Sequence, residues 1–228
     1  MGGALPPQYL FEWMKCSHWT SVEYSSYVGN QVYETGVNVC STGFRDYRYT
    51  DVGWKSFEQE WQFHSSPKFD LIYSVAAFEH IDDLGSCLDA CHKMLAEGGI
   101  LYSNFSPIWS APNGSHGFHP AELNDLGDHS HLMFDFVSLQ EFLLSKGCDI
   151  LYSRNCAERL YRFPQINRYT YEQFVSLFDS APFREKRINP IDLQIFGDLY
   201  KSEKLSAITR FNPMMTHSCA GFEVMMMK

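Results

Sequence analysis

The sequence has no apolar run of the roughly 18 residues that a membrane-spanning helix requires. Its first residues, MGGALPPQYLFEW, lack a basic segment followed by a long apolar stretch, so we expect no secretory signal. Internal repeats, low-complexity tracts and Gly/Ser linkers are also missing. We therefore predict a cytoplasmic protein that uses no membrane and folds as a single domain over residues 1–228.

Basic residues are scarce. The chain carries 18 Lys and Arg against 27 Asp and Glu, a formal net charge of −9. Neither a basic run nor a basic stripe occurs in it, which argues against nucleic acid as the main partner. We interpret the acidic surface as a source of solubility.

The cysteines do not form a recognisable framework. There are seven, an odd number at scattered spacings, so we predict reduced thiols and no disulfide scaffold. Cys87 and Cys91 lie four residues apart on a predicted helix. Because no second Cys/His pair at ligand spacing lies nearby, we interpret them as small buried apolar residues rather than as metal ligands.

What the sequence does contain is a clear strand–helix–strand unit. Residues 69–74, FDLIYS, form an apolar run of buried-strand length, and residues 75–80 lead into a helix. Gly98 and Gly99 are predicted to end that helix, and residues 100–105 form the next strand. This order is typical of a right-handed βαβ unit in a parallel sheet.

Elsewhere the periodicity predicts further elements. Helices are expected over 7–15, 26–35, 138–146 and 170–180, and strands over 19–25, 37–40 and 221–227. Thr170 suits an N-cap, and Pro182 follows the end of its helix. Residues 45–66 are expected to be loop with a helix near 54–62, and 106–137 a long loop of the kind that is usually functional or mobile.

One stretch resembles a known family. KFDLIYSVAAFEHIDDLGSCLDACHKMLAEGGILYSNFSP is similar to the middle of class I S-adenosylmethionine-dependent methyltransferases. Three further stretches agree with this resemblance. VEYSSYVGNQVYETGVNV resembles the family's second strand, the helix after it and the third strand. YTYEQFVSLFDSAPFREKRI resembles the late helix and the strand that follows it, and SCAGFEVMMMK resembles the closing strand. The resemblance implies an α/β, Rossmann-like sheet, mostly parallel with an antiparallel final strand and helices on both faces, and an irregular substrate-side insertion at about 106–165.

The resemblance also implies a site for the cofactor S-adenosylmethionine. Glu23 ends the second strand, where a carboxylate accepts hydrogen bonds from ribose hydroxyls. By this resemblance, the chain begins inside the family's glycine-rich loop and lacks the first strand of the sheet. We therefore expect one of three outcomes: the sheet closes over the missing strand, another segment takes the place of that strand, or cofactor binding is impaired. The residues expected at the cofactor are Gly2, Gly3, Glu23, Gly43, Phe44, Ser74, Val75 and Ala76.

Histidines are the candidate catalytic bases. His80 opens a helix beside the expected cofactor, and its ordinary pKa near 6.5 suits proton transfer. The middle loop adds His116, His119, His129 and His131, and we choose His80, His119 and His131 as catalytic candidates. Structural roles for these residues remain open. The His-x-His and His-x-x-His spacings also suit a divalent metal, but no nearby cysteine supports that, and we predict no metal site.

The resemblance thus implies methyl transfer from S-adenosylmethionine to a small or medium-sized O- or N-acceptor, a small molecule or a glycan. The cofactor is intrinsically activated, so the protein mainly orients and desolvates the reactants. Two alternatives remain open. One is a truncated or degenerate methyltransferase fold that serves as a binding module without activity. The other is a dinucleotide oxidoreductase, which the EH turn and the GG–strand pattern disfavour.

Overall fold

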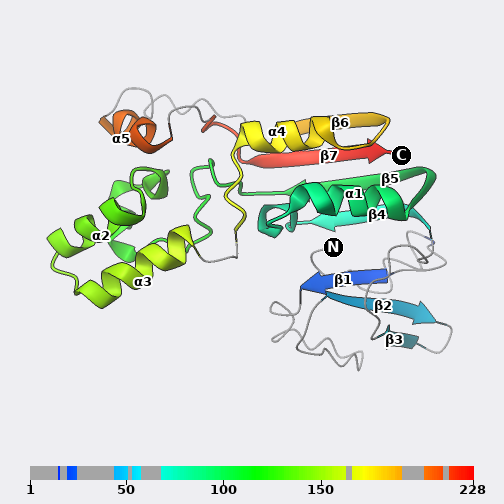
Figure 1. Ribbon diagram of the computed structural model, residues 1–228, viewed down its shortest axis with the longest axis horizontal. Helices are drawn as coiled ribbons and strands as arrows, with labels where there is room; N and C mark the ends of the chain where they lie inside the picture. The colour runs from blue at the N-terminus through cyan, green and yellow to red at the C-terminus, as the bar shows by residue number, and fades with distance from the viewer. Residues whose placement is uncertain are drawn as a thin grey trace.

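A four-stranded mixed sheet organises the chain. The computed structural model describes residue 15, the backbone of residues 20–24, 44–50 and 53–57, and residues 68–162, 166–191, 203–212 and 216–228. The sheet holds β4 (Phe69–Val75), β5 (Leu95–Phe105), β6 (Glu185–Ile191) and β7 (Gly221–Met227) in the order β4-β5-β7-β6. β4 is parallel to β5, and β7 is antiparallel to both of its neighbours (Figure 1). Three strands therefore share one direction and the last is reversed, which confirms the predicted sheet.

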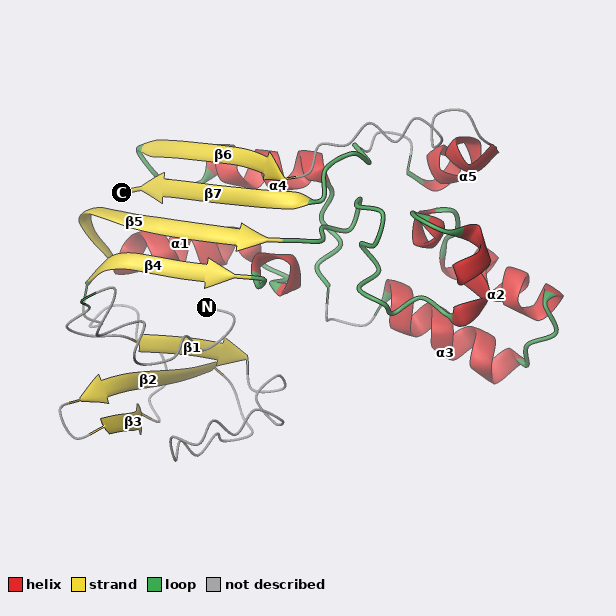
Figure 2. Cartoon of the chain, turned by 180° about the vertical axis from the view of Figure 1, so that it is seen from behind, coloured by secondary structure: helices red, strands yellow, loops and turns green. Residues whose placement is uncertain are grey.

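Two helices cover one face of this sheet. α1 (Leu84–Met94) and α4 (Tyr171–Ser180) lie on the same side of the strands in both views (Figures 1 and 2). The predicted helices on both faces are therefore observed on one face within the described residues. The burial of side chains along β5 alternates accordingly. Leu101, Ser103 and Phe105 are buried on the side of the helices, whereas Tyr102 is half-buried.

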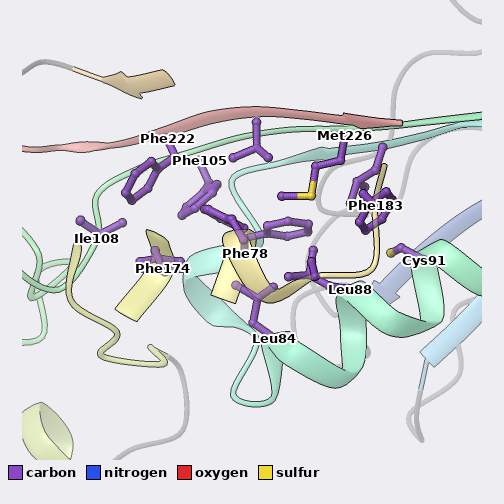
Figure 3. Close-up of a cluster of buried hydrophobic side chains, with 14 of the residues drawn as sticks. Phe78, Leu84, Leu88, Cys91, Phe105, Ile108, Phe174, Phe183, Phe222 and Met226 are labelled. Atoms are coloured by element: carbon purple, nitrogen blue, oxygen red, sulfur yellow. The ribbon is translucent and has the colours of Figure 1, made fainter. Parts of the chain in front are cut away.

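Aromatic side chains fill the space between helices and sheet, as Figure 3 shows. The Phe105 ring lies with its centroid 5.1 Å from that of Phe174, 5.6 Å from that of Phe78 and 5.8 Å from that of Phe222. All four are at most 1% exposed. Rings at these spacings add specific edge and stacking contacts to the area that they bury. Cys91 lies in this core and Cys87 packs against it, as small apolar residues would.

The boundaries of α1 differ from the prediction. Residues 75–80 make a turn and the short 3₁₀ helix η3 (Phe78–His80), and α1 begins only at Leu84, where the Asp83 side chain accepts from the Ser86 backbone N–H. The helix ends at Met94 because Leu95 is already extended. Gly98 and Gly99 therefore lie inside β5 and do not stop the helix. Gly98 has a φ of 76°, close to the register shift between β4 and β5.

The late elements follow the sequence closely. Thr170 caps α4 in a reciprocal capping box with Gln173, as its position predicts. β6 and β7 occupy the two stretches that resembled the late strands of the family. The predicted closing strand over 221–227 is confirmed exactly at its bounds by β7.

The N-terminal part is arranged differently from the expectation. β1 (Thr20–Tyr24), β2 (Phe44–Thr50) and β3 (Gly53–Phe57) form a separate antiparallel sheet in the order β1-β2-β3. The predicted strand over 19–25 is present, but it pairs with β2 instead of joining the larger sheet. The prediction of a loop and a helix over 45–66 is wrong where β2 and β3 form, because these residues are strands. The expected elements over 7–15, 26–35 and 37–40 lie outside the described residues, apart from residue 15.

A helical lobe, defined here as residues 106–162 together with α5 (Glu203–Phe211), lies beyond the carboxyl ends of β4 and β5 (Figure 2). It contains 3₁₀ helices η4 (Ala121–Leu126) and η5 (Ser130–Leu132) and the helices α2 (Phe136–Ser145) and α3 (Ile150–Tyr161). Leu139, Leu143 and Leu160 help to fill its own core. The prediction captured α2 but missed α3 and α5. Among the described residues, no helix is both long and apolar enough to span a bilayer.

Candidate active site

The carboxyl ends of β4 and β5 form the edge at which the site is expected. Ser74 pairs with Ser103 and Val75 with Asn104, and the Ala76 N–H donates to the Asn104 carbonyl over 2.9 Å. Ser74 is fully buried, Val75 is half-buried and Ala76 is exposed. Ala76 has a φ of 48°, a left-handed conformation that turns the chain sharply away from the strand. Three of the predicted cofactor residues therefore share this edge.

Glu79 follows this turn as a buried carboxyl group. It is 1% exposed, and within the described part of the chain its Oε2 atom has no hydrogen-bond partner. Burial raises the pKa of Glu79 to about 8. A buried carboxyl with an unsatisfied oxygen costs stability. Among the described residues Glu79 shares this property with Ser74, Ser103, Ser110 and His217.

The Asn167 side chain fixes the turn that carries Glu79. Its Nδ2 donates to the carbonyls of Phe78, over 2.6 Å, and Ile81, over 3.0 Å. The Asn167 N–H donates to the Glu79 carbonyl over 2.9 Å. One residue from the segment before α4 thus holds three carbonyls of η3 and its flanks. Sequence reasoning missed Asn167, because nothing near position 167 indicates a contact more than 80 residues away.

His80 lies next to Glu79 on the same turn. Its Nε2 is 3.8 Å from Glu79 Oε1, and its side chain is 23% exposed, so it can meet both the buried carboxyl and an incoming molecule. The ring also contacts His116 edge-on, with centroids 5.0 Å apart. His116 Nε2 donates to the Pro107 carbonyl over 2.7 Å, and burial lowers its pKa to about 4. His116 is therefore neutral near pH 7, although it was not chosen as a catalytic candidate.

The other two catalytic candidates lie within the helical lobe. His131 is 1% exposed and its Nε2 donates to the Trp109 carbonyl over 2.8 Å, while burial lowers its pKa to about 3. His119 lies between Ser115 Oγ, at 2.7 Å from Nδ1, and Asn124 Oδ1, at 2.9 Å from Nε2. Both imidazoles are engaged in the lobe's own hydrogen bonds. Of the three candidates, His80 is the one that the structure brings to the carboxyl ends of β4 and β5.

The remaining predicted cofactor residues belong to the N-terminal part. Glu23 is the fourth residue of β1, opposite Arg45, and Phe44 begins β2 opposite Tyr24. The expected parallel pairing of the Glu23 strand within the main sheet is corrected here, because β1 pairs with β2 in an antiparallel sheet. Gly2, Gly3 and Gly43 lie outside the described residues.

Comparison with known proteins identifies one domain family. Residues 15–103 match the family model described as a methyltransferase domain. This segment contains β1 to β4, α1 and most of β5, and it includes the stretch on which the resemblance was based. The match confirms the resemblance to class I S-adenosylmethionine-dependent methyltransferases. A search of curated proteins gives no match.

Solved structures give weak overlaps. A phosphoethanolamine N-methyltransferase 2 from Haemonchus contortus, in complex with S-adenosyl-L-methionine, has a TM-score of 0.32 at 10% identity over 70% of this chain and 33% of that one. A SAM-dependent methyltransferase from Archaeoglobus fulgidus has a TM-score of 0.33 at 11% identity over 73% and 63%. The chain thus spans a third of the first protein's length. Overlaps of this size do not identify a substrate.

Proposed function

We propose that this chain, whose residues 15–103 carry the methyltransferase-domain sequence, transfers a methyl group from S-adenosylmethionine to a small or medium-sized acceptor through oxygen or nitrogen. The observation that supports it most is the domain match, which ends within β5, the parallel neighbour of β4. Glu79 and His80 follow the carboxyl end of β4. Open α/β sheets bind ligands at this edge.

The residues at the edge suit such a cofactor. Ala76, which is exposed and has a left-handed backbone conformation, leaves the backbone after β4 accessible. The unsatisfied Oε2 atom of Glu79 lies three residues further along the chain. Ser74, Val75 and Ala76 would contact the cofactor through backbone and shape, and Glu23 would accept from its ribose hydroxyls. Gly2, Gly3, Gly43 and Phe44 complete the proposed set. When bound, S-adenosylmethionine supplies a methyl group on positively charged sulfur.

The chain's own chemical task is then to orient the acceptor and to remove its proton. His80 is the proposed base, because its imidazole is partly exposed at the strand end, whereas His131 is buried and His119 is engaged on both ring nitrogens. The helical lobe beyond this edge is proposed to form the acceptor side. Loops and insertions at strand ends commonly set specificity while the sheet holds the cofactor.

One observation favours a second candidate. β1, which carries Glu23, pairs with β2 and β3 rather than with the main sheet. If this arrangement persists in solution without the cofactor, the chain serves as a binding module with a methyltransferase-like sheet and no activity. The two candidates differ in one measurable property, the affinity for the cofactor.

Isothermal titration calorimetry tests the proposal directly. We expect S-adenosylhomocysteine to bind with one-site stoichiometry and NADH to give no heat, since the dinucleotide serves as the control for a general nucleotide site. An absence of heat with S-adenosylhomocysteine at high micromolar concentration would contradict the proposed function and favour the binding module. Heat with NADH alone would favour an oxidoreductase instead.

A further inference from the structure

We propose that Asn167 is a positioning residue that couples the helical lobe to the turn bearing His80. Asn167 belongs to a linking segment, defined here as residues 166–169, which lies between α3 and α4 in the chain. The chemical purpose of this coupling rests on the proposed function. The coupling itself is a property of the chain alone, and it can be measured both with and without a ligand.

The linking segment holds the η3 turn by its backbone carbonyls. Asn167 provides three of the hydrogen bonds, two from its side-chain amide and one from its backbone N–H, and the Tyr169 hydroxyl provides another. The carbonyls that accept them are those of Phe78, Glu79, Ile81 and Asp82. His80 lies in the middle of these four residues, so its place at the carboxyl end of β4 depends on a segment that comes after the lobe in the chain.

The asparagine amide matches its partners on both sides. Its two N–H groups donate to two carbonyl oxygens, while Oδ1 accepts from the Tyr169 backbone N–H over 3.2 Å. Aspartate has the same shape, but its ionised side chain offers only acceptors. Asn167→Asp therefore replaces two attractive contacts with the turn by repulsive ones while the size of the side chain stays the same.

The linking segment is also anchored in the lobe. Ile166 is 1% exposed and belongs to the lobe core. The Arg168 guanidinium donates to the Leu160 carbonyl from Nε, at 3.1 Å, and from Nη2, at 2.9 Å, and its Cζ atom is 5.6 Å from the Trp109 ring centroid. Leu160 lies in the last turn of α3, where backbone carbonyls lack a partner within the helix. Arg168 therefore joins the segment to the end of α3.

The backbone of Arg168 indicates that both anchors act together. Its φ is 57°, a left-handed conformation that costs free energy in a residue with a side chain. Such a conformation persists where the surrounding contacts determine it. Asn167 and Tyr169 reach the turn, and Arg168 between them reaches the lobe. A displacement of α3 is therefore transmitted to η3 through one residue, which links the proposed acceptor side to the proposed base.

Hydrogen exchange of the full chain tests the coupling without a ligand. The His80 backbone N–H donates to the Ala77 carbonyl, so its exchange rate reports the opening of the turn. We expect Asn167→Asp to raise this rate by about tenfold or more, because two hydrogen bonds are lost. Asn155→Asp makes the same chemical change at an exposed position of α3 and should leave the rate unchanged. An unchanged rate in folded Asn167→Asp would overturn the proposal.

A variant on the lobe side distinguishes coupling from local support of the turn. Arg168→Lys keeps the charge and leaves Asn167 in place, but it loses the planar fork that holds the Leu160 carbonyl. We expect it to raise the exchange rate of the His80 amide by about threefold or more, the effect of a lost hydrogen bond. An unchanged rate would contradict the coupling, and this variant decides if Asn167→Asp does not fold.

Calorimetry connects the coupling to the proposed function. Folded Asn167→Asp should bind S-adenosylhomocysteine about tenfold more weakly than the wild type, because the turn continues directly from the backbone of Ala76. Asn155→Asp should bind as the wild type does. A purely structural role would lower the free energy of unfolding and leave this affinity unchanged, which would refute the positioning role. If the wild type itself does not bind, the proposed function fails, and the exchange rates alone decide on the coupling.

Discussion

The main sheet and the helical lobe both bury polar groups without partners, Ser103 Oγ in the sheet and Ser110 Oγ in the lobe, but their buried titratable side chains differ. In the lobe, His131 is buried but its ring donates to a backbone carbonyl, and buried His129 likewise bonds to the carbonyl of His217. At the carboxyl edge of the sheet, Glu79 is as deeply buried and keeps one oxygen unsatisfied. A satisfied buried group stabilises the fold, whereas an unsatisfied one lowers stability. The two regions therefore differ in whether their buried titratable side chains are fully hydrogen-bonded.

The largest expected effect comes from the core of the sheet. Phe105→Ala removes a fully buried ring that contacts Phe78, Phe174 and Phe222, and should lower the free energy of unfolding by about 3–5 kcal/mol. Val137→Ala on α2 is the control, since Val137 is 58% exposed and its loss should matter little. Urea denaturation followed by circular dichroism measures both. Equal destabilisation by the two variants would remove the distinction between core and surface.

Glu79→Gln should stabilise the protein at alkaline pH. The pKa of Glu79 is raised to about 8 in the folded chain, above its ordinary value of 4.5, so folding favours the neutral form. Stability is then lost as pH rises from about 4.5 toward 8, because the unfolded chain ionises first. At pH 8 the variant should gain about 3 kcal/mol over the wild type, with little difference at pH 4. Urea midpoints at both pH values measure this, and a loss of stability at pH 8 would show that Glu79 serves the fold.

Glu23→Ala examines the N-terminal part of the proposed cofactor site. We expect it to weaken the binding of S-adenosylhomocysteine by about 1–3 kcal/mol, the cost of losing hydrogen bonds to a charged acceptor. Calorimetry measures the affinity, with Glu97→Ala as the control carboxyl. If folded Glu23→Ala binds as tightly as the wild type, Glu23 is not in the site.

His131→Gln should reduce the acid sensitivity of the lobe. Burial lowers the pKa of His131 from 6.5 to about 3. The unfolded chain therefore protonates this imidazole near pH 6.5, whereas the folded chain protonates it only near pH 3. Stability is therefore lost as pH falls from about 6.5 toward 3. Gln can still donate to the Trp109 carbonyl but does not titrate. The difference in unfolding free energy between pH 7 and pH 5 should shrink by about 1–2 kcal/mol in the variant, and an unchanged difference would assign the acid sensitivity elsewhere.

The elements of the main sheet and its helices could be predicted from the sequence where local sequence signals agree with the tertiary structure. FDLIYS is a mainly apolar run of strand length that follows Lys68, and Thr170 is followed at the third position by Gln173, so β4 and α4 are encoded locally. Gly98 and Gly99 misled the prediction because a glycine pair serves a bulge within a strand as readily as a helix end. α3 was missed because its apolar residues Ile150 and Leu151 are exposed and blur the periodicity.

The site was predictable only in part. The EH pair after β4 marked the turn, and the structure places His80 there, in η3. The burial of Glu79 and the contact of His116 with His80 depend on chain segments far apart in sequence, which no local pattern encodes. The pairing of β1 with β2 was likewise unpredictable, because alternating strand patterns do not specify a partner.

The most direct test maps S-adenosylhomocysteine onto the chain by ¹H–¹⁵N chemical-shift changes. The account predicts that the amides of Val75, Ala76 and His80 shift on titration, whereas those of Glu97, at the opposite end of β5, and His131, within the lobe core, do not. Shifts confined to residues away from the carboxyl ends of β4 and β5 would contradict it, as would a spectrum unchanged at high micromolar ligand.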